Sequence, residues 1–184
     1  MTKQLFYITV LTFISIIATA QNKYYTKSGK INFKASVPSF EEVEAQSTTV
    51  TAILDITNGE IAALALVKSF RFKIALMEEH FNENYAETSL FPKATFTGKI
   101  DNFSPKDLKV APKLFNLTGK LTFHGKTVEI NPKVSVSIRN EIIYLTTKFK
   151  VNIEDFNIKI PKLIKKKVAK TVEVTINFKL NTKS

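Results

Sequence analysis

The residues whose side chains could do chemistry are few and lie far apart in the sequence. The only histidines are His80 and His124, and the chain has no cysteine. Two distant histidines make a poor metal site, because even a catalytic zinc ion takes three protein ligands. Glu79 and Glu83 could place carboxylates beside His80, but charged side chains on a helix usually form only a solvated face. We therefore expect no metal site and no cofactor.

A hydrolytic site would need a nucleophile, a base and an orienting acid. Ser104 and Ser137 lie in no nucleophile motif, and the five glycines form no phosphate-binding loop. Asp155 is typical of a turn in which a carboxylate accepts backbone amides. His124 precedes Gly125 in an expected hairpin turn, where its ring could fix the register by hydrogen bonding across the turn; contact with a ligand is the alternative. We expect no catalytic residue and no enzyme.

Most of the chain alternates between apolar and polar residues, as half-buried β-strands do. Asn58-Gly59 is a strong hairpin signal, and His124-Gly125 and Asn131-Pro132 separate later strands. The sequence predicts a mainly antiparallel sheet. The alternating runs lie at 31–33, 70–76, 94–96, 117–123, 134–138, 143–153 and 172–180.

Two stretches suggest short helices. From Met77 to Ala86, the side chains of Met77, Phe81 and Tyr85 recur at a spacing of four, which is typical of one helix face. A second helical turn could run from Ser39 to Ala45, with Ser39 as its cap. We find no internal repeat or linker, so the chain after its first twenty residues is expected to be one domain.

A sheet of this length must hide its apolar face, either between two stacked sheets or inside a closed barrel. An eight-stranded barrel is about the size that either fills with side chains or holds one small ligand. The chain has 15 phenylalanines and no tryptophan. These rings could form a filled core or the wall of an apolar tunnel, and composition does not choose between the two.

The N-terminus has the features of a cleaved secretory signal. One lysine precedes an apolar run from Leu5 to Ala18, and Ala18-Thr19-Ala20 supplies the small residues that signal peptidase requires. We predict a signal peptide at residues 1–20, a mature domain at residues 21–184, and a periplasmic or extracellular location. The formal net charge is +11, but only two residues are arginine, the residue that best reads nucleic acid. We therefore expect no nucleic-acid partner.

Three segments of the chain, at residues 77–100, 117–128 and 149–158, together resemble the YceI-like family of exported lipid-binding proteins. The first, residues 77–100, is similar to the family's helix, its connection and the strand that follows. Residues 117–128, Leu-Thr-Gly-Lys-Leu-Thr-Phe-His-Gly-Lys-Thr-Val, resemble its histidine-glycine hairpin, and residues 149–158 resemble its late Asp-Phe stretch. The resemblance implies an eight-stranded antiparallel lipocalin-like barrel, whose cavity takes the apolar chain of an isoprenoid lipid or a similar amphiphile, for transport or storage.

Such a site needs no charged anchor, because each buried methylene contributes about 0.8 kcal/mol. We expect a lining of apolar side chains from the strands, the helix and the connection after it. The candidate ligand-binding residues are Phe33, Phe72, Ile74, Met77, Phe81, Tyr85, Phe91, Phe96, Phe123, Val136, Phe149 and Ile176.

Five lysines between Lys162 and Lys170 form either a solvated connection or a surface that approaches anionic membrane headgroups. The rival hypothesis for the whole protein is a structural or stress-related envelope protein. Its barrel would be filled by its own phenylalanines, and it would act through its basic surface. The sequence does not indicate an oligomeric state.

Overall fold

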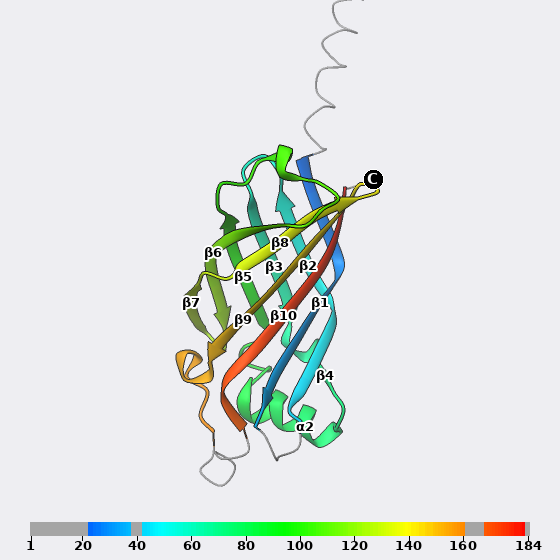
Figure 1. The fold of residues 1–184 in the computed structure, drawn as a ribbon. Helices are drawn as coiled ribbons and strands as arrows, with labels where there is room; N and C mark the ends of the chain where they lie inside the picture. Colours follow the sequence, from blue (N-terminus) through cyan, green and yellow to red (C-terminus); the bar gives the residue numbers. More distant parts are fainter. Residues whose placement is uncertain (1–21, 38–41, 161–167, 183–184) are drawn as a thin grey trace, which may run out of the picture.

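The fold is a closed antiparallel β-barrel, seen in a computed structural model that describes residues 22–37, 42–160 and 168–182. Eight strand positions follow one another in the order β1, β10, β9, β8, β6, β5, β3 and β2, and pairing of β2 with β1 closes the ring (Figure 1). This confirms the expected eight-stranded barrel. Closure leaves no open edge between β1 and β2, where Tyr24 pairs with Leu54.

The described part of the chain contains the following elements. The strands are β1 (Lys23–Ser36), β2 (Glu44–Asp55), β3 (Glu60–Leu66), β4 (Arg71–Phe72), β5 (Lys93–Ile100), β6 (Lys113–Phe123), β7 (Lys126–Ile130), β8 (Lys133–Arg139), β9 (Ile142–Asn152) and β10 (Val168–Thr182). The helical elements are α2 (Ala75–His80), the π-helix η3 (Phe81–Tyr85), and the 3₁₀ turns η2 (Val67–Ser69), η4 (Pro105–Asp107) and η5 (Ile153–Phe156).

Ten strands fit eight positions because two positions are each filled by an interrupted strand. β2 pairs first with β3 and then, beyond η2, with β4. In the same way β6 pairs with β7 and β8, which are separated at Asn131-Pro132. Proline has no N–H to donate to a ladder, which explains the break at Pro132. Near this break η5 contacts β7.

The structure differs from two of the expectations that we drew from the sequence. The alternation from Phe70 to Leu76 predicted a long strand, but only Arg71 and Phe72 pair, and the helix begins at Ala75. After β4 the chain leaves the sheet and lies across one end of the barrel, shown at the bottom of Figure 1. The expected turn at Ser39–Ala45 lies partly outside the described residues, and its described part enters β2 at Glu44 instead of a helix.

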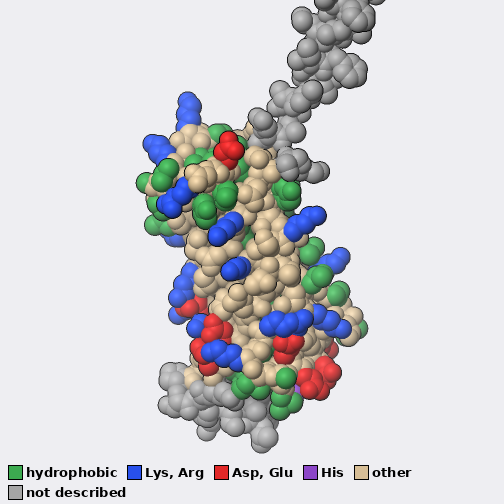
Figure 2. All heavy atoms as spheres, turned by 90° about the vertical axis from the view of Figure 1, so that its right-hand side faces the viewer, with side chains coloured by type: hydrophobic (Ala, Val, Ile, Leu, Met, Phe, Trp, Pro, Cys, Tyr) green, Lys and Arg blue, Asp and Glu red, His purple; other side chains and the backbone are tan. Residues whose placement is uncertain are grey.

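The barrel is packed solidly in the half farther from α2. Leu54, Ile100, Ile143 and Leu180 are completely buried there, and they come from four different strands. They point inward because successive side chains of a strand alternate between its two faces. Figure 2 shows that on one face of the molecule the acidic side chains gather mainly toward the α2 end, mixed with lysines. No helix in the described ranges is long and apolar enough to cross a membrane.

Candidate functional site

The half of the barrel nearer α2 is hollow. Its cavity has a volume of about 470 Å³ and is walled by side chains from every strand except β8, together with α2, η3 and η5. All but four of the lining residues are apolar, the exceptions being His80, Tyr85, Thr95 and Thr147. No lysine, arginine, aspartate or glutamate of the described ranges lines it. A barrel filled by its own phenylalanines, the rival we considered, does not fit this hollow interior.

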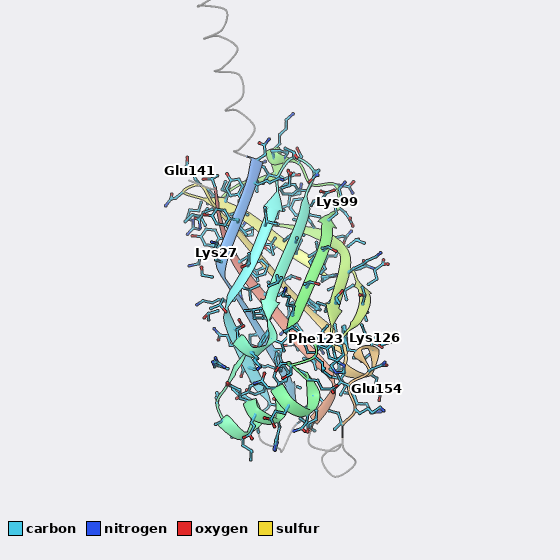
Figure 3. All side chains as sticks on the ribbon, turned by 180° about the vertical axis from the view of Figure 1, so that it is seen from behind. Lys27, Lys99, Phe123, Lys126, Glu141 and Glu154 are labelled. Carbon is cyan, nitrogen blue, oxygen red and sulfur yellow. The ribbon has the colours of Figure 1, made fainter. Side chains whose placement is uncertain are left out.

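Nine of the twelve candidate residues lie in the cavity wall. They come from the strands on all sides of the barrel and from the helical segment across its end. Figure 3 shows Phe123, at the end of β6, and Glu154 of η5 on the same side of the barrel, toward its α2 end. The nine residues are Phe33, Phe72, Met77, Phe81, Tyr85, Phe96, Phe123, Phe149 and Ile176. Their contact with a ligand stays a prediction.

The other three candidates lie outside the cavity wall. Val136 points inward but belongs to the packed half, where it is 1% exposed. Ile74 caps the start of α2 instead of extending a strand. Phe91 packs edge-on against the ring of His124, with 4.5 Å between the centroids. Val136 is fully buried, Ile74 and Phe91 are partly buried, and none of the three lines the cavity.

Sequence reasoning missed part of the wall that is built from small residues. Ala63 and Ala65 of β3 and Ala94 of β5 line the cavity, and Ala65 pairs with Ala94 across the ladder. Small side chains at inward positions leave the space that larger ones would fill. The signal was the alternating run Ile61, Ala63, Ala65, in which the inward residues become small.

A cluster of four phenylalanines fixes the helical segment over the end of the barrel. Phe81 of η3 lies 5.4 Å from Phe33 of β1 and 5.1 Å from Phe72 of β4, measured between ring centroids. Phe33 also lies 5.3 Å from Phe70. Pairs of rings at these distances stabilise by about 0.5–1.5 kcal/mol beyond their buried area. The cluster therefore attaches η3 to the barrel, and its rings also form one wall of the cavity.

His124 joins three segments that flank the cavity. The expected hairpin turn between β6 and β7 is confirmed, and the positive φ of both His124 and Gly125 is typical of a two-residue type I′ turn. The ring Nδ1 donates to the carbonyl oxygen of Phe156 in η5 at 2.9 Å, and Nε2 lies 2.7 Å from Glu87 Oε2 in the connection after η3. The expected bond across its own turn is therefore replaced by bonds to two segments distant in sequence.

We expect His124→Ala to lower the free energy of unfolding by about 1–3 kcal/mol, because the Phe156 carbonyl loses its donor in a largely buried place. Urea denaturation followed by circular dichroism measures the loss. Glu87→Gln keeps an oxygen acceptor at the other ring nitrogen and should cost less. Equal stability of the His124→Ala variant and the parent would show that these bonds do not hold η5 in place.

Beside the cavity, ion pairs connect β1, the residues before β2 and the residue after β4. Glu42 lies 2.9 Å from Lys73 and 3.3 Å from Lys34. These two ammonium groups, that of Lys73 first, lower the pKa of Glu42 to about 2. Glu44 and then Glu42 raise the pKa of Lys34. Lys34, Glu42 and Lys73 are solvent-exposed, and only Glu44 is half-buried, so the pairs affect the local geometry more than the stability.

Two of the four polar lining residues can be described further, Tyr85 by the pKa of its phenol and Thr147 by its hydrogen bond. Burial raises the pKa of the Tyr85 phenol, so it stays neutral at physiological pH. Thr147 donates its hydroxyl to the carbonyl of Lys133 at 2.8 Å, so that proton is already used. Among the described residues, no group of three or more histidine, aspartate or glutamate side chains is arranged to hold a metal ion.

Comparison with known proteins identifies the same architecture. The model of the YceI-like domain family matches residues 23–180. A polyisoprenoid-binding domain from Saccharophagus degradans implicated in plant cell wall breakdown is 16% identical, with a TM-score of 0.77 over 89% of this chain and 99% of that chain. BcnA from Burkholderia cenocepacia is 17% identical, with a TM-score of 0.69 over 83% of this chain and 96% of the other.

A YceI protein from Campylobacter jejuni is also similar, at 14% identity and a TM-score of 0.65 over 80% of this chain and 90% of that chain. At these identities the likeness concerns the fold. A search of curated protein sequences finds no match.

Proposed function

The chain belongs to the YceI-like family, and we propose that it binds the apolar chain of an isoprenoid lipid or a similar long-chain amphiphile in the barrel cavity. The observation that carries this proposal is the cavity of about 470 Å³ whose lining holds no charged side chain in the described ranges. Its size falls within the range of small-molecule sites in proteins. The polyisoprenoid-binding relative has the same fold and adds support for this ligand class.

The energetics favour a long apolar ligand over a polar one. Each methylene moved from water into the cavity contributes about 0.8 kcal/mol, so a tail of several isoprene units binds without a charged anchor. A charged head inside this lining would lose its hydration and find no counter-ion, which costs several kcal/mol. We therefore place the tail inside the cavity, and the head near His80 and Tyr85 at the α2 end, where polar lining residues are present.

The role that follows from such a site is binding, for carriage or storage of the lipid, with no chemical step. We also propose export to the periplasm or the outside of the cell, with cleavage after Ala20. Residues 1–21 lie outside the described residues, and the proposal rests on their sequence. Contact with an anionic membrane through the lysine-rich segment at 162–170 is a further proposal, and most of that segment also lies outside the described residues.

The experiment that tests the function is extraction of the purified protein with organic solvent, followed by mass spectrometry of the extract. We expect an isoprenoid or other long-chain lipid in near-stoichiometric amount, because transfer of an apolar chain from water into an apolar cavity is favourable. A protein purified under the same conditions that lacks a cavity serves as the control. An empty protein that also fails to bind added prenyl lipids would refute the proposal and favour the surface-acting alternative.

A further inference from the structure

The wall of the barrel is interrupted between β7 and the end of β9. β9 pairs with β8 over residues 142–147, but over residues 148–152 it pairs with β10 alone among the described strands. β7 lies in the same strand position as β8, so its outer edge turns toward β9, and no described strand pairs with that edge. Two strand edges therefore lie on either side of a break in the ladder, which we call the side slot.

The side slot lies along the cavity. Side chains from both of its edges line the cavity wall, and so do side chains of η5, the 3₁₀ turn that follows β9. η5 contacts β7, and Figure 1 shows it just below β7 at the left of the barrel. η5 therefore covers the side slot at the α2 end of the barrel. The lining residues around the slot are Ile130 and Pro132 on one side, Phe149 and Val151 on the other, and Ile153 and Phe156 in η5.

Phe156 is the side chain by which η5 closes the slot. Its ring is only 2% exposed, lines the cavity and lies 5.8 Å from the ring of Phe123, measured between centroids. Its carbonyl oxygen accepts the hydrogen bond from His124 at 2.9 Å. A short 3₁₀ turn has poorer hydrogen-bond geometry than an α-helix. η5 can therefore separate from β7 without breaking any bond of the sheet.

The cover at the α2 end is attached more firmly. Phe81 packs against Phe33 at 5.4 Å and against Phe72 at 5.1 Å. Glu78 of α2 also accepts hydrogen bonds from Arg71 and from the backbone N–H of Phe72. Passage between two strands that a ladder joins would break several backbone hydrogen bonds at once. The side slot is therefore the part of the cavity wall that opens with the smallest loss of contacts.

We propose that an apolar chain enters and leaves the cavity through the side slot, with η5 as the lid and Phe156 as the side chain that blocks the way. This inference rests on the proposed function, since it names the route by which the ligand of that cavity is exchanged. Movement of η5 away from β7 takes the Phe156 ring out of the cavity wall. The chain then passes between two strand edges that have no ladder to break.

The first test fixes the lid in place. The chain has no cysteine, so Lys126→Cys in β7 and Glu154→Cys in η5 supply the only thiols that a short, cleavable bismaleimide can join. Both residues are exposed and lie on the same side of the barrel (Figure 3). We expect the cross-link to slow both uptake and release of a fluorescent fatty acid by about tenfold or more, measured by stopped flow on the lipid-free protein. Cleavage of the linker should restore both rates.

The matched control for the cross-link is Thr146→Cys with Asn177→Cys. These two exposed residues are strand partners on β9 and β10, and their side chains already share a hydrogen bond. A ladder holds the two strands together at this point, so the same linker adds no constraint on η5. Both rates should stay within about twofold of those of the unlinked protein.

The second test compares two truncations of the same side chain. Phe156→Ala and Phe81→Ala each remove a ring that lines the cavity, so each loses contacts with the ligand and speeds its release. Only Phe156→Ala also removes the side chain that blocks the slot. We therefore expect Phe156→Ala to speed uptake by about tenfold, and Phe81→Ala to leave the uptake rate near that of the parent.

The outcomes separate the route from the binding function. If the fatty acid binds but the cross-linked protein takes it up as fast as the unlinked one, the side slot is not the route and the binding function stands. Faster uptake in Phe81→Ala and an unchanged rate in Phe156→Ala would place the route at the α2 end instead. If no fatty acid or prenyl lipid binds, the binding function itself fails. Should Phe156→Ala not fold, the cross-link decides alone.

Discussion

The double substitution Ala63→Phe and Ala94→Phe should abolish the binding of an apolar chain, lowering the affinity at least a hundredfold. Both alanines line the cavity, one on β3 and the other on the neighbouring β5. Each substitution adds six ring carbons at an inward position, so the two rings together narrow the cavity from neighbouring strands and displace an apolar chain from it. A chain excluded from the cavity loses about 0.8 kcal/mol for each methylene it no longer buries.

The matched control for this variant is Ala62→Phe. Ala62 is the neighbour of Ala63 on β3, and successive residues of a strand face opposite sides of the sheet. The same chemical change therefore lies on the outer surface and should leave the affinity unchanged within about twofold. Displacement of a fluorescent fatty acid measures binding, and circular dichroism confirms the fold. Unchanged binding by the folded double variant would show that the ligand binds elsewhere.

Leu180→Ala should lower the free energy of unfolding by about 2–5 kcal/mol, the usual cost of truncating a leucine in a packed core. Leu180 is completely buried, and its strand partner Ile143 is buried as well. The change leaves a hole in the half of the barrel that holds no ligand, and the surrounding side chains fill it only in part. Affinity for a lipid should therefore stay near that of the parent once the protein is folded.

Ile176 on the same strand provides the comparison. Its side chain already faces the cavity, so it lacks partner atoms on one side, and Ile176→Ala should cost less than about 2 kcal/mol. The ligand-free protein is the proper state for both measurements, because a bound lipid would add its own stabilisation. Urea denaturation gives the two values. Equal losses at Ile176 and Leu180 would mean that the α2 half of the barrel is packed in solution.

The α2 end shows where local patterns stop being informative. The alternation from Phe70 to Leu76 satisfies a strand, yet only two of these residues pair with β2. The chain there must cross the end of the barrel, and the contacts of Phe81 with Phe33 and Phe72 favour a helical turn over continued pairing. Those contacts join segments far apart in the sequence, so no local window contains them.

Phe91 and His124 illustrate the same limit. The turn predicted at His124 is confirmed, since this residue begins a two-residue turn. The hydrogen-bond partners of His124 could not be predicted, because Phe156 and Glu87 come close to it only when the barrel is closed. A bond between the β6–β7 turn and η5 depends on how far the strands are shifted along one another, and alternation carries no information on that shift.

The amino-acid sequence by itself determined the class of fold, the family and, in the strands whose alternation it showed, which face turns inward, because side chains alternate along a strand whatever the strand pairs with. The tertiary structure alone decided which inward residues surround empty space. Val136 and Leu145 pair across β8 and β9 and both point inward, yet only Leu145 reaches the cavity. Height along the barrel axis is set by strand register and closure, and neither is contained in the local alternation of one strand.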